Sequence, residues 1–272
     1  VWSTTETTQA ITVTTAGSYT VEYTDGNGCK ATSAATTVTV NALPVAAVNS
    51  ETICAGDPAV TFIATSATAV GWSWSENGTG TLQNTSGTIA GNYTVVVTDA
   101  NGCESAPATG VLTVNALPAA PTITAGGPTT LCDGESVVLT SSEATGNVWS
   151  TAETTQAITV TTAGSYTVEY TDGNGCNATS AATTVTVNAL PAAPTITAGG
   201  TTTLCDGASV VSTSSEATGN GWSNGGTDQA ITVSAAGSYT GAYMDGIGCI
   251  ATSAATSVTV NSLPAAPTIT AG

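Results

Sequence analysis

The chain has 272 residues and a formal net charge of −17, because eighteen acidic residues stand against a single base, Lys30, and there is no histidine. Without histidine, Ser-His-Asp and Cys-His catalysis and His-ligated metals are excluded. One Lys and no Arg provide no phosphate clamp, which excludes nucleic acid and anionic membranes as partners. No apolar run approaches the ~20 residues of a membrane span. We therefore expect a protein that is not an enzyme.

The chain is built from repeats. The motif Asn41-Ala42-Leu43-Pro44 returns at residues 115–118 and 188–191, and as Asn-Ser-Leu-Pro at 261–264, with spacings of 74, 73 and 73 residues. A fixed period of this kind indicates copies of one small domain. We expect a partial repeat at 1–44, complete repeats at 45–117 (the divergent one), 118–190 and 191–263, and the first strand of a further repeat at 264–272. Because Val1 aligns with Val148, inside a repeat, we expect the chain to be a section of a longer one.

Short alternating segments predict β-strands in the 118–190 repeat. Apolar and polar residues alternate with period two, which is typical of half-buried strands. The strands are predicted at residues 121–124, 136–140, 147–150, 156–161, 166–170 and 183–187. Asp172-Gly173-Asn174-Gly175 predicts a hairpin turn, because Gly and Asn tolerate positive φ. Six or seven short strands in about 73 residues predict an all-β chain of tandem small immunoglobulin-like sandwiches in a rod-like array.

The predicted core of such a repeat is thin, so a covalent staple is expected. Its inward residues are Ile123, Leu131, Val137, Leu139, Trp149, Ile158, Val160, Tyr166, Val168, Tyr170, Val185 and Val187.

Each complete repeat has two cysteines, and we expect one disulfide within each. The expected pairs are Cys54 with Cys103, Cys132 with Cys176, and Cys205 with Cys249. Cys29 aligns with Cys176, and its partner is expected before Val1. Isolated cysteine pairs lack the Cys-x-x-Cys spacing of a zinc site. Disulfides predict an extracellular location.

The motifs of the repeat resemble those of a known group. Leu131-Cys132, Trp149, residues 163–166 (Ala-Gly-Ser-Tyr) and residues 172–176 (Asp-Gly-Asn-Gly-Cys) resemble the Ig-like repeats of giant secreted Bacteroidetes surface proteins, such as gliding adhesins and other type IX secretion cargo. This resemblance covers the whole chain at the level of motifs. It implies a secreted, surface-exposed filament whose sorting domain lies elsewhere.

Eight aligned aromatic residues are expected to serve the core. In Ig-like sandwiches the tryptophan packs on the disulfide and the tyrosine forms a corner hydrogen bond. A fifth tryptophan, Trp74, has the parity of Trp72 and is expected to point inward, with sugar stacking as the alternative. The aligned residues are Trp2, Trp72, Trp149, Trp222, Tyr19, Tyr93, Tyr166 and Tyr239.

No cofactor is expected. A Cys132–Cys176 bridge would bring Asp133 and Glu135 near Asp172 and Asn174, and oxygen-rich clusters bind Ca²⁺. Other repeats carry Ala55, Ala208 and Ile247 at these positions, however, and a required metal site would not lose ligands between copies of one chain.

The last repeat departs from its siblings. Leu139, Val148 and Val168 are replaced by Ser212, Gly221 and Gly241. Each change is expected to remove core volume and to make the 191–263 repeat the least stable.

These features leave three functional hypotheses. The first is a structural and adhesive segment of an extracellular filament, a disulfide-stapled spacer that reaches other cells, surfaces or glycans through regions outside this segment. The second is a homo-oligomer that bundles laterally into a fibre or hook for attachment, which the outward Thr159, Thr161, Thr167, Thr184 and Thr186 permit. The third is a module that binds glycan or protein itself.

Overall fold

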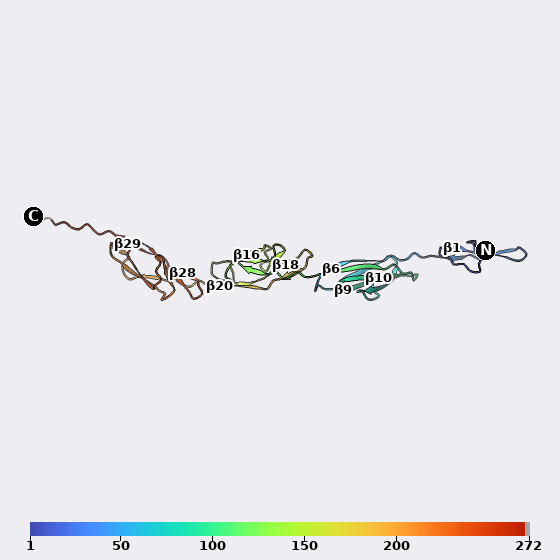
Figure 1. Ribbon diagram of the computed structural model, residues 1–272, viewed down its shortest axis with the longest axis horizontal. Coiled ribbons are helices and arrows are strands. Elements are labelled where there is room, and N and C mark those ends of the chain that lie inside the picture. The colour runs from blue at the N-terminus through green and yellow to red at the C-terminus, as the bar shows by residue number, and fades with distance from the viewer. Residues whose placement is uncertain (270–272) are drawn as a thin grey trace. The chain divides into compact units, whose positions relative to one another are not determined.

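The computed structural model describes residues 1–269, and every regular element in them is a β-strand. By internal contacts, the chain divides into two compact units: Val1–Leu117 with Asn174–Cys176, and Pro118–Gly173 with Asn177–Gly272. In Figure 1, β6 and β10 lie close together within one group of strands, and β16 and β18 within another. The described residues include no helix long and apolar enough to cross a membrane.

The 118–190 repeat is a sandwich of two layers. One layer is a three-stranded sheet in the order β12-β14-β16, with Leu139 opposite Ile158 in an antiparallel register. In the other layer, β20 pairs with β13 and β17, and β18 pairs with β15 and β19. The strands are β12 (Ile123–Ala125), β13 (Thr130–Cys132), β14 (Val137–Ser141), β15 (Asn147–Trp149), β16 (Ala157–Val160), β17 (Gly164–Tyr166), β18 (Val168–Thr171), β19 (Asn177–Thr179) and β20 (Thr183–Asn188).

The apolar residues that alternate along these strands meet between the two layers. Leu139 and Val168 are fully buried, and Val168 lies directly opposite Trp149, which is 2% exposed. Of the twelve inward residues predicted above, nine form the buried cluster and Ile123 and Val187 pack against it, while Tyr170 is only half-buried outside the cluster. The cluster is Leu131, Val137, Leu139, Trp149, Ile158, Val160, Tyr166, Val168 and Val185.

Three strands of this repeat were not predicted. The predicted strand at 166–170 is divided at Thr167 into β17, which pairs with β20, and β18, which pairs with β15. The two others are β13 and β19. β13 is short and carries the first cysteine, and β19 follows the predicted turn and pairs with β18. Both are three residues long, too short for alternation to be recognised. The predicted all-β immunoglobulin-like fold is confirmed.

The 45–117 repeat has the same two layers with longer strands. Its sheets have the orders β5-β7-β9 and β6-β11-β10-β8. The Phe62 and Tyr93 rings stack in its core with centroids 4.1 Å apart. The strands are β5 (Ala47–Val48), β6 (Glu51–Cys54), β7 (Val60–Thr65), β8 (Ala69–Glu76), β9 (Asn84–Gly87), β10 (Gly91–Asp99) and β11 (Ala108–Asn115).

The alignment of Trp72 with Trp149 is wrong, because Trp74 occupies that place. Trp74 lies opposite Val95, as Trp149 lies opposite Val168, and it is 7% exposed. Its indole N–H donates to the carbonyl of Leu82, as that of Trp149 donates to Thr155. Trp72 is half-buried and packs at the edge of the core. The two tryptophans share a face as their parity predicts, and burial of Trp74 argues against sugar stacking.

The 191–263 repeat has the sheets β21-β23-β25, β22-β29-β26 and β24-β27-β28. Its buried cluster holds only Leu204, Val210, Val233 and Val258, fewer residues than the clusters of the two other complete repeats. The strands are β21 (Ile196–Ala198), β22 (Thr203–Cys205), β23 (Val210–Ser214), β24 (Asn220–Trp222), β25 (Ala230–Val233), β26 (Gly237–Tyr239), β27 (Gly241–Met244), β28 (Ile250–Thr252) and β29 (Thr256–Asn261).

Two of the three substitutions in this repeat remove core volume. Ser212 replaces the fully buried Leu139, and its Oγ is buried without a hydrogen-bond partner among the described residues. Gly241 replaces the buried Val168 beside Ile196 and Trp222. Gly221 is the exception, because the equivalent Val148 is 45% exposed on the outer face of its strand. The expectation of lost core volume is therefore wrong at that position.

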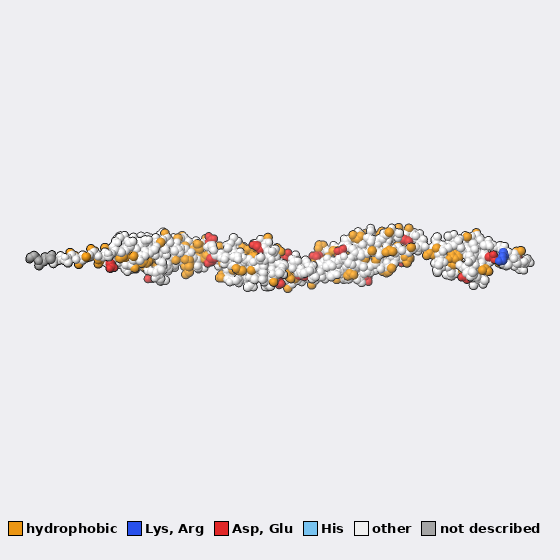
Figure 2. Space-filling model, turned by 90° about the horizontal axis from the view of Figure 1, so that it is seen from above, with side chains coloured by type: hydrophobic (Ala, Val, Ile, Leu, Met, Phe, Trp, Pro, Cys, Tyr) orange, Lys and Arg blue, Asp and Glu red, His pale blue; other side chains and the backbone are white. Residues whose placement is uncertain are grey.

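Residues 1–44 form two strand pairs, β1 with β4 and β2 with β3. The predicted strand at 264–272 is not present in its described part, 264–269, and its residues 270–272 lie outside the described residues. On the face shown in Figure 2, acidic side chains are scattered along the molecule and many hydrophobic side chains are exposed between them. The strands are β1 (Gly17–Tyr19), β2 (Glu22–Thr24), β3 (Lys30–Thr32) and β4 (Thr36–Val38).

Restoring one side chain should strengthen the last repeat. Ser212→Leu replaces a buried, unpartnered hydroxyl with the residue that its sister repeat uses, so we expect a gain of about 1–3 kcal/mol. Hydrogen exchange followed by mass spectrometry should show slower exchange in peptides from 191–263 and unchanged exchange in peptides from 118–190. The matched control, Leu139→Ser, should produce the opposite pattern. Equal exchange of Ser212→Leu and the unaltered chain would contradict the core assignment.

Candidate functional site: the cystines between repeats

The second cysteine of each repeat sits on a hairpin turn. In the 191–263 repeat, the Asp245 carboxylate accepts hydrogen bonds from the backbone N–H groups of Ile247, Gly248 and Cys249, each at 2.9 Å. Gly248 has a φ of 101°, which favours glycine directly before the cysteine. The equivalent Asp25 and Asp99 make the same bond to the N–H of Cys29 and Cys103.

This turn lies at the end of the sandwich where the chain enters. β27 runs toward it, and its last residue, Met244, donates to the carbonyl of Gly219, just before β24. β24 starts at that end, with Asn220 opposite Tyr243. The strand before it, β23, ends there with Ser214 opposite Ile196, the residue that begins the first strand of the repeat. We call the cysteines on these turns the entry cysteines: Cys29, Cys103, Cys176 and Cys249.

The first cysteine of each complete repeat lies at the opposite end. Cys205 ends β22, which runs parallel to the last strand, β29, and faces Asn261. The same register places Cys132 opposite Asn188 and Cys54 opposite Asn115. These asparagines are the residues with which the chain leaves each sandwich toward the next. We call Cys54, Cys132 and Cys205 the exit cysteines.

An entry and an exit cysteine of one repeat are too far apart to bond. In the 191–263 repeat, β26 starts with Gly237 opposite Val258, and the entry turn begins at Asp245. Asn261, which Cys205 faces, lies three residues beyond Val258, and Asp245 lies eight residues beyond Gly237 in the opposite direction. About ten residue positions therefore separate the two cysteines along the sheet. At about 3.3 Å a residue this amounts to roughly 30 Å, whereas a disulfide joins Cα atoms 4.4–6.8 Å apart.

The structure pairs two of the three exit cysteines, each with the entry cysteine of the next repeat. Cys132 bonds Cys249, with Cα atoms 5.5 Å apart, and Cys54 bonds Cys176, with Cα atoms 5.6 Å apart. Cys29, Cys103 and Cys205 are unpaired. The expected pairs Cys54–Cys103, Cys132–Cys176 and Cys205–Cys249 are therefore wrong, and so is the expectation that the tryptophan packs on a disulfide within its own repeat.

A spacing in the sequence already argued against the expected pairing. In immunoglobulin domains the corner tyrosine precedes the core cysteine by two residues. Two residues after Tyr166 stands Val168, the fully buried partner of Trp149, whereas Cys176 follows Tyr166 by ten residues. The core position of the usual cysteine is thus filled by an aliphatic side chain, and the cysteines of this chain are elsewhere.

The tyrosine corners themselves are present. The hydroxyl of each aligned tyrosine donates to the backbone carbonyl four residues upstream, at 2.8–3.1 Å: Tyr19 to Thr15, Tyr93 to Ile89, Tyr166 to Thr162, and Tyr239 to Ala235. The indole N–H groups of Trp2 and Trp222 also donate to backbone carbonyls, those of Thr8 and Asp228. These hydrogen bonds fix loops. Four of the aromatics are also buried as predicted, namely Tyr93, Trp149, Tyr166 and Trp222, whereas Trp2, Tyr19 and Tyr239 are only half-buried.

The carboxylates proposed for Ca²⁺ are not brought together by a bridge within one repeat. Glu135 instead accepts a hydrogen bond from the N–H of Cys132 at 2.8 Å, and Asp57 does the same for Cys54. Asp172 belongs to the entry turn, at the other end of the sandwich. The acids beside the exit cysteines therefore hold the backbone that presents the sulfur, and Ala208 removes that carboxylate beside Cys205.

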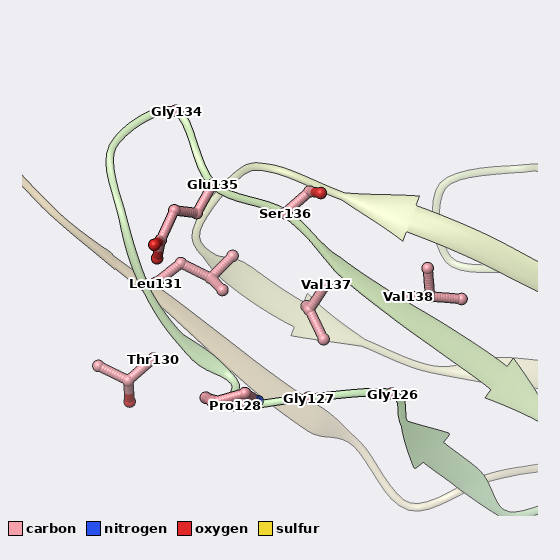
Figure 3. A pocket seen from close by; sticks show the side chains of 10 residues that line it. All are labelled: Gly126, Gly127, Pro128, Thr130, Leu131, Gly134, Glu135, Ser136, Val137 and Val138. Atoms are coloured by element: carbon pink, nitrogen blue, oxygen red, sulfur yellow. The ribbon is translucent and has the colours of Figure 1, made fainter.

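A shallow hollow lies beside each of two exit cysteines. In the 118–190 repeat it measures about 530 Å³, and its walls are the Gly126–Gly127–Pro128 turn and the segment from Gly134 to Val138. Figure 3 shows Gly134 at the tip of its loop, with the Glu135 carboxylate turned back toward the strand of Leu131. The equivalent hollow of the 191–263 repeat measures about 540 Å³ and includes Cys205 itself in its wall.

Charge around these sites is almost entirely negative. The one basic side chain, Lys30, forms an ion pair with Glu22 at 2.7 Å on the pair of strands β2 and β3. In the turn before Cys103, the Asp99 carboxylate accepts hydrogen bonds from backbone N–H groups, above all from that of Cys103. These hydrogen bonds hold the pKa of Asp99 below its usual value.

Comparisons with known proteins add a resemblance of shape only. No family model and no curated protein matches the chain. A three-immunoglobulin segment of titin is 14% identical, with 82% of this chain and all of that chain covered, at a TM-score of 0.34. Murine CEACAM1b is 13% identical, with 53% of this chain and all of that chain covered, at 0.29. SGBP-B of the Bacteroides ovatus mixed-linkage glucan utilization locus, in complex with a mixed-linkage heptasaccharide, is 15% identical, with 82% of this chain and 72% of that chain covered, at a TM-score of 0.21. Such values carry no information about what this chain binds.

The Asp99 turn should make stability depend on acid pH. A carboxylate whose pKa is lowered by folding stabilises the fold above its unfolded pKa, about 3.9, and loses that contribution as the pH falls through the folded value. The melting temperature of the unaltered chain should therefore be higher than that of the Asp99→Ala variant, and the difference between them should be largest near pH 7. We expect the difference to shrink steadily from pH 5 to pH 2. The exposed neighbour variant Glu104→Ala is the control, and a difference for Asp99→Ala that is constant with pH would contradict the assignment.

Proposed function

We propose that this chain is a structural spacer that works outside the reducing cytosol, in which disulfides between repeats hold neighbouring sandwiches together under tension. One observation supports this proposal above the others: Cys132 at the exit end of one sandwich is bonded to Cys249 at the entry end of the next. Two covalent connections then join these sandwiches, the linker that follows Asn188 and the disulfide. Disulfides persist mainly in oxidising compartments, which supports the extracellular location.

The disulfides take the linker out of the path that carries force. The loop closed by Cys132 and Cys249 includes the whole segment between the two sandwiches, so a pull on the chain passes through the disulfide while the linker stays slack. The Cys54–Cys176 loop overlaps it, because Cys132 lies inside the first loop and Cys176 lies inside the second. The shortest covalent path through the chain then contains only about 120 of the 272 residues, or roughly 43 nm at 3.6 Å each.

The composition supports an exposed spacer. With a net charge of −17, neighbouring chains repel one another, which opposes clumping. A single Lys and no Arg leave trypsin-like proteases one cleavage site. We also propose that the protein attaches to cells, surfaces or glycans through other regions, and that it belongs to the secreted Bacteroidetes adhesins. The resemblance of motifs supports both parts of the proposal.

Lateral bundling is the second candidate function. The outer faces of several strands carry exposed threonines, among them Thr159, Thr184 and Thr186, and few charges. Such uncharged faces suit side-by-side contact between copies, although they suit a solvated sheet equally. Glycan binding by each repeat has less support, because the tryptophan proposed for it, Trp74, is buried.

Single-molecule force spectroscopy with matched cysteine variants tests the proposal. Under full extension Cys132→Ser should lengthen the chain by about 30 residues, roughly 10 nm, because it opens one of two overlapping loops. Cys205→Ser should leave the length unchanged, since Cys205 is unpaired.

Pairing within each repeat predicts another result, a gain of about 44 residues for Cys205→Ser, or roughly 15 nm. That outcome would overturn the proposal. A reducing agent gives the reference length of the fully open chain, and each variant should reach the same reference length when it is reduced.

A further inference from the structure

The Cys54–Cys176 disulfide joins two repeats whose cores are built without sulfur. The buried clusters of the 45–117 and 118–190 repeats are made of aliphatic and aromatic residues. In each of these repeats a tyrosine corner adds a hydrogen bond from the Tyr93 or Tyr166 hydroxyl to a backbone carbonyl. Breaking this disulfide therefore leaves the contacts within both clusters in place.

The backbone holds an exit cysteine in the same way whether its sulfur is bonded or not. Cys132, which is in a disulfide, ends its strand opposite Asn188, and the N–H that follows it donates to the Asn188 carbonyl at 2.8 Å. Cys205, which has a thiol, stands opposite Asn261 in the same register, and the N–H that follows it donates to the Asn261 carbonyl at 2.8 Å. The strand pairing, and not the sulfur, fixes the position of the cysteine.

The turn that presents an entry cysteine is likewise the same in both states. Around the bonded Cys249, the Asp245 carboxylate accepts the cysteine N–H at 2.9 Å, and the cysteine carbonyl accepts the Asp245 N–H at 3.0 Å. Cys103 has a thiol, and its two hydrogen bonds with Asp99 also measure 2.9 and 3.0 Å. An entry turn therefore keeps its shape when its cysteine is reduced.

The linker keeps the two cysteines of one junction within reach of each other. Cys54 faces Asn115 at the end of β11, and the first strand of the next repeat begins at Ile123, eight residues later. Eight residues span at most about 29 Å. A tether of this length gives its two ends an effective concentration in the millimolar range. A junction that has opened can therefore close again on the same partner.

A folded sandwich also keeps the competing thiol away. Cys132 and Cys176 lie at opposite ends of the 118–190 repeat, as far apart as their counterparts in the 191–263 repeat, at roughly 30 Å. In an unfolded chain the preference reverses, because 44 residues separate Cys132 from Cys176 and 122 separate Cys54 from Cys176. Loop-closure entropy then favours the shorter loop by about fivefold. The pairing formed on reoxidation therefore reports whether the sandwiches are folded.

We propose that the Cys54–Cys176 junction is a redox-sensitive switch, which a low-molecular-weight thiol opens while both sandwiches stay folded, and which an oxidant closes on the same pair. In the open state the linker alone joins the two repeats, so the chain gains reach at the junction and keeps its domains. This inference rests on the position of the disulfide between repeats and holds whether or not the chain bears tension.

Reduction begins at the exit cysteine, because Cys54 is half-buried whereas Cys176 is 1% exposed. A glutathione thiolate attacks the Cys54 sulfur, the S–S bond breaks, and Cys176 leaves as a thiolate. A second glutathione thiolate attacks the mixed disulfide and releases Cys54. Two glutathione thiols are oxidised to one glutathione disulfide, and their two protons end on the two cysteines. Glutathione disulfide reverses the same steps when the junction closes.

Hydrogen exchange of the full chain tests whether the sandwiches survive reduction. The unpaired thiols are first blocked with N-ethylmaleimide, the disulfides are mapped, and glutathione then reduces the chain. We expect peptides from β7, β10, β14 and β18 to exchange within about threefold of their rates in the oxidised chain. Faster exchange from an oxidised chain with the Cys54–Cys176 bond would overturn the switch alone. A Cys132–Cys176 bond in the first map would overturn both the switch and the proposed function.

Reoxidation with glutathione disulfide tests whether the junction closes on the same pair. In native buffer, mass spectrometry of peptic peptides should find Cys54–Cys176 at least tenfold more abundant than Cys132–Cys176. In concentrated urea the Cys132–Cys176 pair should become the more abundant of the two, by about fivefold. A ratio below tenfold in native buffer would overturn the proposal, because the folded sandwich would then not direct the pairing.

Two variants separate an open junction from a damaged core. Cys54→Ser opens the junction without a reductant, and exchange in the 45–117 and 118–190 repeats should stay within about threefold of the unaltered chain. Leu139→Ser leaves the cysteines in place and weakens the core, so it should accelerate exchange in the 118–190 repeat by at least tenfold. If Cys54→Ser accelerated exchange in either repeat as Leu139→Ser does in its own, the disulfide would be a part of the fold and the switch would be wrong.

Discussion

The parallel pairing of the cysteine-bearing strand with the last strand of its repeat is the constraint from which the rest follows. It fixes one cysteine beside the asparagine at which the chain leaves the sandwich. The hairpin that joins β27 to β28 holds the other cysteine where the chain enters. A sandwich that places its two thiols at opposite ends has no means of closing a bond between them. Its cysteines can therefore bond only to neighbouring repeats, and the disulfides join two domains instead of stabilising one.

Because the disulfides lie between the sandwiches, each core has to hold its two sheets together without one. Leu139, Val168 and Trp149 fill the place where an immunoglobulin domain keeps its disulfide, so the fold of each repeat depends on aliphatic packing and on the tyrosine corner. A loop of more than 100 residues, such as the one that Cys132 and Cys249 close, stabilises by roughly 5 kcal/mol on the chain-entropy model. That contribution is shared by two repeats, because unfolding either one alone leaves the loop closed.

The local pattern of this chain was predictable, and its connectivity was not. Alternation identified six strands and nearly all of the core, since period two reports directly which side chains face inward. It missed the short strand of Cys132, and without that strand nothing in the spacing of cysteines shows that they lie at opposite ends. Trp72 was misaligned for a related reason: two tryptophans of equal parity stand in one strand, and only the register with Val95 and Val97 distinguishes them.

The last repeat combines a reduced core with a disulfide to its neighbour. Ser212 and Gly241 replace the two aliphatic residues at the place of the usual disulfide, and a buried hydroxyl without a partner is left among the described residues. An isolated domain of this size would have little stability left to lose. Here Cys249, on the entry turn of the same repeat, ties it to a sister repeat whose core is complete. The reduced core is thus found in a repeat that a disulfide joins to a neighbour with a larger buried cluster.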